Sequence, residues 1–200
     1  MEERGYPVKD GGVFEDEEEI ILPTGPKPRG LVDAPRPRGG GNPASDAVIV
    51  DRRRGKFSDL YPDTSALIKL YVEEEQGREL VREAVGGADR VATSTVAYAE
   101  ARVALARKER EGQLDRGQHL RAVEALDAEW RGFVRILVSN LVAYRAWEVA
   151  ERYALRGFDA IHLASAVRLG ERFDDLFFLA FDDRLVEAAR GASVAVYGGR

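Results

Sequence analysis

The sequence has no cysteine, only two histidines and no long hydrophobic run. Without cysteine the chain cannot form disulfides or thiolate zinc sites, and a reducing cytoplasm is the expected compartment. Histidine-rich metal or triad chemistry has little scope, because His119 and His162 are the only imidazoles. No apolar stretch approaches membrane-spanning length, and the first residues lack the basic and apolar regions of a secretory signal. We therefore expect a cytoplasmic protein without a membrane span.

The formal net charge is −5. This charge argues against nucleic-acid binding through a broadly basic surface. The objection weakens if several acids form one cluster that is filled with cations, because bound metals reverse the local field.

Residues 1–54 differ in composition from the rest of the chain. Residues 1–23 carry two basic and eight acidic residues, whereas residues 24–54 carry seven basic and three acidic ones. Prolines and a run of three glycines interrupt any helical or strand period in the second part. Such a segment cannot bury enough apolar surface to offset its ordering entropy, so we expect an extended or disordered arm. Two short runs could depart from this: Glu19–Leu22 could pair as a strand, and Ser45–Val50 could start a helix.

Residues 55–200 form the second expected unit, in which strand and helix patterns alternate. The strand segments are apolar without alternation, which favours a parallel sheet covered on both faces. The expected strands end near residue 62 and cover 90–94, 133–138, 176–181 and 194–197. The expected helices cover 64–71, 76–85, 96–110, 115–130, 139–155, 159–169 and 184–189. The predicted fold class is α/β: a three-layer α/β/α sandwich with a mainly parallel central sheet, preceded by the arm.

Four acidic residues lie at the start of an expected helix or one turn into it: Asp63, Glu100, Asp159 and Asp182. A parallel sheet would gather these carboxylates at one edge. Asp63, Asp159 and Asp182 have an ordinary alternative as turn residues or helix N-caps, which does not exclude metal binding.

Glu100 and Asp159 are harder to explain as caps alone. Each shares a predicted core-facing stripe with apolar residues three or more positions away: Val96, Val103 and Ala104 for Glu100, and Leu163, Ala166 and Val167 for Asp159. Buried acids are rare unless they are paired or bound to metal.

Carboxylates gathered at one edge need compensation. Two like charges about 4 Å apart repel by roughly 1 kcal/mol in water and about 4 kcal/mol at an effective dielectric constant near 20. Either some of the acids protonate or a divalent cation occupies the site. Oxygen ligands without Cys or His favour Mg²⁺ or Mn²⁺ over zinc. Such ions polarise a phosphoryl oxygen and lower the pKa of bound water.

Neighbouring polar residues have open roles. Thr64 and Ser65 could orient a phosphate or a water at the helix start, or simply belong to it. His162 follows Asp159 by three positions and could approach the acids, although packing is the commoner role of such a histidine. Lys69 is expected on a solvated helix face. Asp183 is a second candidate beside Asp182.

Four segments resemble the motifs of the PIN-domain family, and specifically of VapC-type ribonuclease toxins of toxin–antitoxin systems. They are DTSALIKLY from Asp63, STVAYAEARVAL ending at Leu105, GFDAIHLASA from Gly157 and FDDRLVEAA from Phe181. The resemblance covers about residues 60–197. It implies an endoribonuclease that hydrolyses RNA with Mg²⁺ or Mn²⁺, has an antitoxin as partner, and forms a homodimer through the helices of residues 96–130.

Carried over by position, Asp63, Glu100, Asp159 and Asp182 would be the catalytic, metal-binding acids of such an enzyme. The chain departs from many relatives at Ala180, where they have threonine or serine two residues before the last acid.

The segment PRPRGGGNPASDAVIVDRR, residues 35–53, resembles the C-terminal tail of a Phd- or VapB-type antitoxin. The resemblance suggests antitoxin-like and toxin-like pieces in one chain. Arg36, Arg38 or one of Arg52–Arg54 could then enter the acidic cluster in place of a cation, since a guanidinium suits carboxylates. The alternative is a leader that makes no contact.

Two other function classes compete with the ribonuclease. One is a catalytically inert acidic α/β binding module, whose acids are caps and partner contacts. The other is an aspartyl phosphotransferase or phosphatase of the haloacid-dehalogenase kind, which needs a second Asp two residues after Asp63, where Ser65 stands. The sequence favours the metal-dependent ribonuclease.

Overall fold

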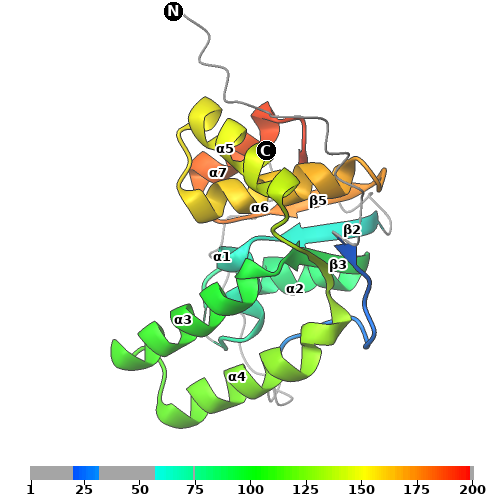
Figure 1. Ribbon diagram of the computed structural model, residues 1–200. Helices are drawn as coiled ribbons and strands as arrows, with labels where there is room; N and C mark the ends of the chain where they lie inside the picture. Colours follow the sequence, from blue (N-terminus) through cyan, green and yellow to red (C-terminus); the bar gives the residue numbers. More distant parts are fainter. Residues whose placement is uncertain (1–19, 32–56, 74, 199–200) are drawn as a thin grey trace, which may run out of the picture.

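The centre of the molecule is a six-stranded sheet with the strand order β1-β4-β3-β2-β5-β6 (Figure 1). The structure is a computed structural model, which describes residues 20–31, 57–73 and 75–198. β1 pairs antiparallel with β4, and the other neighbouring strands are parallel. The strands are β1 (Ile20–Ile21), β2 (Phe57–Pro62), β3 (Ala88–Ser94), β4 (Val134–Ile136), β5 (Leu176–Leu179) and β6 (Ala195–Val196).

Helices cover both faces of this sheet (Figure 1). One layer contains α1 (Thr64–Leu67), the 3₁₀ turn η1 (Ile68–Leu70), α2 (Arg78–Gly87), α3 (Val96–Arg110), α4 (Arg116–Glu129) and the 3₁₀ turn η2 (Trp130–Gly132). The other layer contains α5 (Asn140–Tyr153), α6 (Gly157–Gly170) and α7 (Asp183–Gly191). The predicted three-layer α/β/α sandwich with a mainly parallel sheet is confirmed.

Alternation along the central strands builds two hydrophobic cores. On β2, Leu60 packs with the cluster of α1 to α4, whereas Tyr61 packs with the cluster of α5 to α7. On β3, Val91 and Ala92 divide in the same way. Successive residues of a strand point to opposite faces of the sheet, so fully apolar strands are what a sheet covered on both sides requires.

An N-terminal strap, which we define as residues 20–31, packs along the first layer. Its β1 pairs with β4, so that Ile20 faces Ile136 across the ladder. The amides of Thr24 and Gly25 donate to the carbonyl of Arg131. The short strand predicted within Glu19–Leu22 is therefore confirmed, whereas the helix start suggested for Ser45–Val50 lies outside the described residues.

Polar contacts fix the rest of the strap. Lys27 Nζ donates to the carbonyl oxygens of Val85 (2.9 Å) and Ala88 (2.6 Å), at the carboxyl end of α2, where a cation is favourable. The Glu129 carboxylate accepts from the amides of Arg29 and Gly30, at 2.9 Å each. Part of the N-terminal region thus belongs to the folded unit, and the proposed division at residues 54 and 55 stays a prediction.

Most helices begin and end within a few residues of their expected bounds. The expected helix 64–71 is in fact α1 followed by η1, so it tightens after one turn. In the part of the chain that the structure describes, no helix is both long enough and apolar enough to cross a membrane.

Candidate active site

Asp63 joins β2 to α1 at the carboxyl end of the sheet. Its Oδ1 accepts from the backbone amide of Ala66 (2.9 Å) and from the hydroxyl of Ser65 (2.7 Å), so the predicted N-cap role is confirmed. Asp63 is 4% exposed and makes no ion pair with Lys or Arg among the described residues. Burial raises the pKa of this carboxyl, because the charged form loses its hydration.

Glu100 on α3 is held by a chain of hydrogen bonds. Its Oε2 accepts from the hydroxyl of Thr64 (2.6 Å) and from Nε2 of His162 (2.8 Å). The hydroxyl of Tyr61 lies 3.1 Å from Nδ1 of His162. A carboxylate only accepts, so Nε2 of His162 carries a proton and donates it to Glu100. Burial alone would raise the pKa of Glu100, but the hydrogen bonds from His162 and Thr64 outweigh it and lower the pKa.

Asp159 lies in the first turn of α6, and Asp182 caps α7 by accepting from the amide of Leu185 at 3.0 Å. The pKa of Asp159 is raised first by burial and then by repulsion from Asp182, with a smaller contribution from Glu100. His162 and Arg156 act in the opposite direction. The negative charges of Asp182 and Glu100, which come from different segments of the chain, therefore both act on Asp159.

These acids suit a hard cation in donor chemistry and in charge. They offer carboxylate oxygens, and burial raises the pKa values of Asp63 and Asp159. Among the described residues, however, no three His, Asp or Glu side chains converge closely enough to hold a metal ion between them. The carboxylates would have to draw together around a metal, and their role as ligands stays a prediction.

Three expectations about individual side chains are wrong. Val103 is 65% exposed, because the core face of α3 consists of Ala97, Ala101 and Leu105 instead, so Glu100 lies beside this face. Asp159 is not a helix cap, since α6 begins two residues earlier with Arg156 as its N-cap.

Lys69 is buried rather than solvated. Its Nζ lies 3.4 Å from Glu75 and 4.3 Å from the centre of the Phe181 ring, because η1 turns this side chain inward.

Ser65 and His162 make more contacts with the predicted acids than the sequence indicates. Ser65 donates its hydroxyl to Asp63 and accepts from the amide of Phe181 (3.0 Å), thereby tying the turn after β2 to the turn after β5. His162 is 2% exposed and contacts Glu100, so it belongs to the site and does not merely pack. A polar residue one helical turn after a candidate acid was the only signal for His162 in the sequence.

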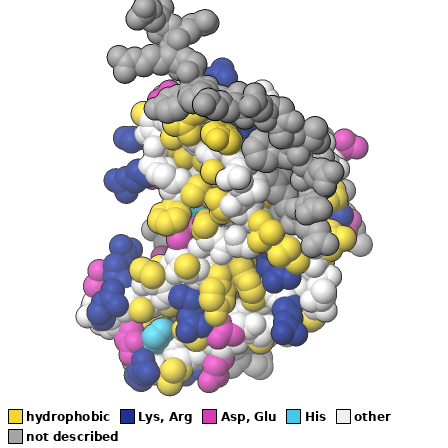
Figure 2. All heavy atoms as spheres, in the orientation of Figure 1, with side chains coloured by type: hydrophobic (Ala, Val, Ile, Leu, Met, Phe, Trp, Pro, Cys, Tyr) yellow, Lys and Arg dark blue, Asp and Glu magenta, His cyan; other side chains and the backbone are white. Residues whose placement is uncertain are grey.

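The surface is hollowed between the layer of α5 to α7 and the layer of α1 and α3, as Figure 2 shows. Acidic and hydrophobic side chains line this hollow, and Lys and Arg side chains project from the rims. Such a distribution would let a polyanion approach acids that carry cations.

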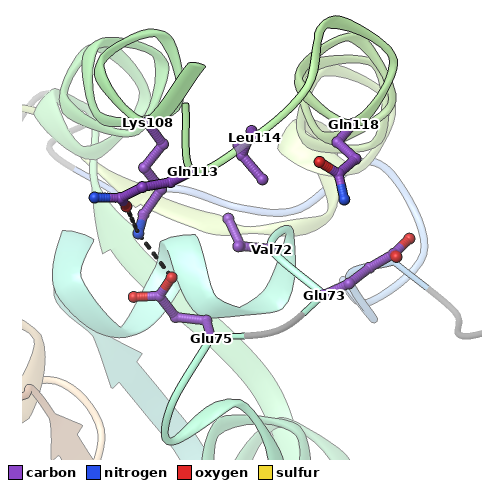
Figure 3. A pocket seen from close by; sticks show the side chains of 7 residues that line it. All are labelled: Val72, Glu73, Glu75, Lys108, Gln113, Leu114 and Gln118. Carbon is purple, nitrogen blue, oxygen red and sulfur yellow. Dashed lines mark hydrogen bonds and ion pairs between the residues drawn. The ribbon is translucent and has the colours of Figure 1, made fainter. Parts of the chain in front are cut away.

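A separate cavity of about 220 Å³ lies between α3, α4 and the segment after η1 (Figure 3). Lys108 in its wall binds Glu75 Oε2 at 2.7 Å and Gln113 Oε1 at 3.1 Å. None of the four predicted acids lines this cavity. Lys108, the basic residue of its lining, is already paired, so it is not free to bind an anionic ligand.

Comparison with known proteins agrees with this architecture. The chain matches the family described as PIN domain over residues 60–191. Ribonuclease VapC45 of Mycobacterium tuberculosis (strain CDC 1551 / Oshkosh) is 33% identical over 137 residues, which cover 68% of this chain and 93% of that protein. Ribonuclease VapC47 of the same organism and strain is 31% identical, over 66% of this chain and 90% of that one.

The fold also resembles a solved structure of FitAcB from Neisseria gonorrhoeae. The TM-score is 0.52 at 17% sequence identity, with coverage of 69% of this chain and 96% of the other. At this identity the likeness supports the fold alone. The family match and the VapC relatives together show that the chain belongs to the PIN-domain family, and within it to the VapC type.

Proposed function

We propose that this protein is a metal-dependent endoribonuclease and the toxic component of a type II toxin–antitoxin system. The observation that carries the proposal is the match to the PIN-domain family over residues 60–191, in which Glu100 is held by Thr64 and His162 and the charges of Asp182 and Glu100 act on Asp159. Relatives that share about a third of their residues with this chain are named ribonucleases.

The residues of the site would have two roles: some would bind the metal ion, and others would hold the metal-binding acids in place. Asp63, Asp159 and Asp182 lack a fixed Lys or Arg ion pair in the described residues and would hold Mg²⁺ or Mn²⁺ together with Glu100. When bound, such an ion supplies positive charge to a phosphodiester and makes a water molecule more acidic. Thr64 and His162 hold Glu100 charged, and Ser65 keeps the turn of Asp63 beside that of Phe181.

An RNA cleavage assay with the full chain tests this proposal. We expect cleavage with Mg²⁺ or Mn²⁺, none in EDTA, and loss of cleavage in Asp63→Asn, whose amide keeps the Oδ1 acceptor of the helix cap. Cleavage that persists in EDTA, or equal rates in the variant, would contradict the proposal. Absence of both Mn²⁺ binding and any effect of Asp63→Asn or Asp159→Asn would favour the inert binding module. A phosphoryl group on Asp63 would favour the phosphotransferase.

The proposal extends to partners. A separate antitoxin, or the arm of residues 1–54, would restrain the nuclease, with an arginine from the arm in the acidic cluster. The strap supports the second alternative because it ends at Leu31, whose carbonyl accepts from Arg78 at 2.7 Å on α2. Gly77, which precedes Arg78, lies against Phe181, the residue before Asp182.

Deleting the whole arm would also remove β1 and Lys27, which pack on the folded unit. A change in activity could then come either from an uncovered active site or from a damaged fold. A better test replaces Arg36, Arg38 and Arg52–Arg54 with alanine in the full chain, with Arg29→Ala in the strap as control. Restraint predicts higher cleavage in the former and no change in the latter. Equal activity at saturating Mg²⁺ would remove this part of the proposal.

The family resemblance also suggests a homodimer formed through the helices between Val96 and Trp130. Exposed apolar residues on this pair of helices, Val103 and Leu120, are compatible with such a contact. Sedimentation of the full chain would test it, and a monomer at high concentration would contradict it.

A further inference from the structure

Phe181 is an exposed aromatic residue directly before Asp182. Its side chain is 38% exposed, although single exposed apolar residues are common and need no function by themselves. What distinguishes Phe181 is the way in which its ring is fixed beside the acids.

Three contacts hold this residue. Its amide donates to the hydroxyl of Ser65, which itself binds Asp63. Lys69 Nζ lies 4.3 Å from the ring centre, within the range of a cation–π contact. The third contact is Gly77, whose φ of +86° and missing side chain make room for the ring. A Cβ at this position would lie only 2.4 Å from Cε1 of Phe181.

Lys69 is an unusual neighbour for an exposed ring. It is 8% exposed and lies 3.4 Å from Glu75, a carboxylate that it shares with Lys108. The ammonium therefore stays in place against the phenyl ring. A ring that is already ordered loses little conformational freedom when a ligand packs against its exposed part.

We infer that Phe181 is a stacking platform for one unpaired nucleobase of single-stranded RNA, adjacent to the phosphate that the acids face. This inference rests on the proposed ribonuclease function and adds to it a base contact beside the acids. Stacking is available to an unpaired base, whose face is open, and it does not depend on the identity of the base. The platform would fix the register of the strand, because the backbone of Phe181 is tied through Ser65 to the turn of Asp63.

The test measures binding of a short single-stranded oligoribonucleotide to the full chain in an Asp63→Asn background, which prevents cleavage. Stacking contributes about 1–3 kcal/mol per base, so Phe181→Ala should weaken binding roughly 5- to 150-fold. Phe181→Trp should retain the affinity, whereas Phe181→Leu, which keeps apolar bulk against Gly77 but loses the aromatic face, should not. Thermal unfolding checks that each variant is folded.

Abasic substitutions along the same oligonucleotide locate the stacked base. With Phe181 present, one abasic position should weaken binding far more than the others, and this position dependence should vanish in Phe181→Ala. Equal affinities for Phe181→Ala and the parent, or full affinity in Phe181→Leu, would overturn the inference while leaving RNA cleavage by the wild type intact. If the wild type neither binds nor cuts RNA, the proposed function fails first and the inference with it.

Discussion

Two buried aspartates, Asp59 within β2 and Asp63 directly after it, have different surroundings. Asp59 is 1% exposed and binds Arg90 through two hydrogen bonds of 2.8 Å. The guanidinium of Arg90 also lies over the ring of Phe173, at 4.1 Å from its centre. Asp63 is buried to a similar degree but has only neutral hydrogen-bond donors and a raised pKa.

The comparison separates an acid that stabilises the fold from one that is available to a ligand. A carboxylate with a bidentate guanidinium partner is satisfied within the chain. A buried carboxylate without a cation is left with part of its desolvation uncompensated, which a folded protein tolerates most readily at a functional site. Burial alone therefore does not identify a functional acid, whereas the nature of its partner does.

The largest expected effect is on catalysis. Asp63→Asn should lower the rate of RNA cleavage by a factor on the order of 10²–10³ or more, because a charged group of the site is lost while the helix cap remains. Asp59→Asn should leave the rate unchanged at temperatures well below its unfolding transition. Initial cleavage rates at saturating Mn²⁺ measure both. Equal losses in the two variants would break the comparison.

The second effect concerns metal binding. Mn²⁺ at about 100 times its dissociation constant should stabilise the wild type by about 2.7 kcal/mol, since it binds only the folded state. Asp59→Asn should keep this increase and Asp63→Asn should lose most of it. Thermal unfolding with Mn²⁺, and again after EDTA, gives the measurement; a metal response retained in Asp63→Asn would show that the ion binds elsewhere.

The third effect is on stability without metal. Asp59→Asn should lower the free energy of unfolding by about 2 kcal/mol, because Arg90 loses a charged partner; its side chain is 37% exposed, so solvent compensates in part. The double variant Asp59→Asn/Arg90→Met should recover some of this loss. Urea unfolding distinguishes these cases, and an unchanged midpoint in Asp59→Asn would show that the pair has no net effect.

The smallest expected effect is that of Asp159→Asn on the free energy of unfolding, and it depends on pH. The pKa of Asp159 is raised in the folded state, by burial and by Asp182, so the folded state binds more protons than the unfolded state as pH rises through this range. Stability therefore falls as the pH rises from the unfolded pKa through the folded one. Asp159→Asn should raise stability at neutral pH by less than about 1 kcal/mol, since the group is partly exposed to solvent. The gain should vanish below the unfolded pKa; a loss at neutral pH would contradict the prediction.

Local chemistry explains which parts of this molecule the sequence could reveal. Asp115 and Ser139, where two of the expected helices begin, are the N-caps of α4 and α5, because a cap depends on a side chain and an amide three residues later. The acids after β2 and β5 were predicted in the same way, from apolar strands followed by helix starts.

Contacts between distant segments could not be predicted from these patterns. Nothing near Glu129 indicates that its carboxylate accepts from the strap, and nothing near Lys69 indicates that it lies against Phe181. Several apolar residues of α3 are alanines, which leaves the direction of its core face ambiguous in the sequence, and Glu100 lies beside this face and not on it. Such features depend on how the layers pack, not on local periodicity.

The strap also determines how the segment that follows it, residues 32–56, could inhibit the nuclease. Residues 32–56 connect two placed segments of the same chain: Leu31, whose carbonyl accepts from Arg78 of α2, and the start of β2. Any inhibitory group within them acts at a local concentration that the length of the tether sets. Dilution would dissociate a free inhibitor but would leave such a group beside its target, so only proteolysis or a competing ligand could relieve it.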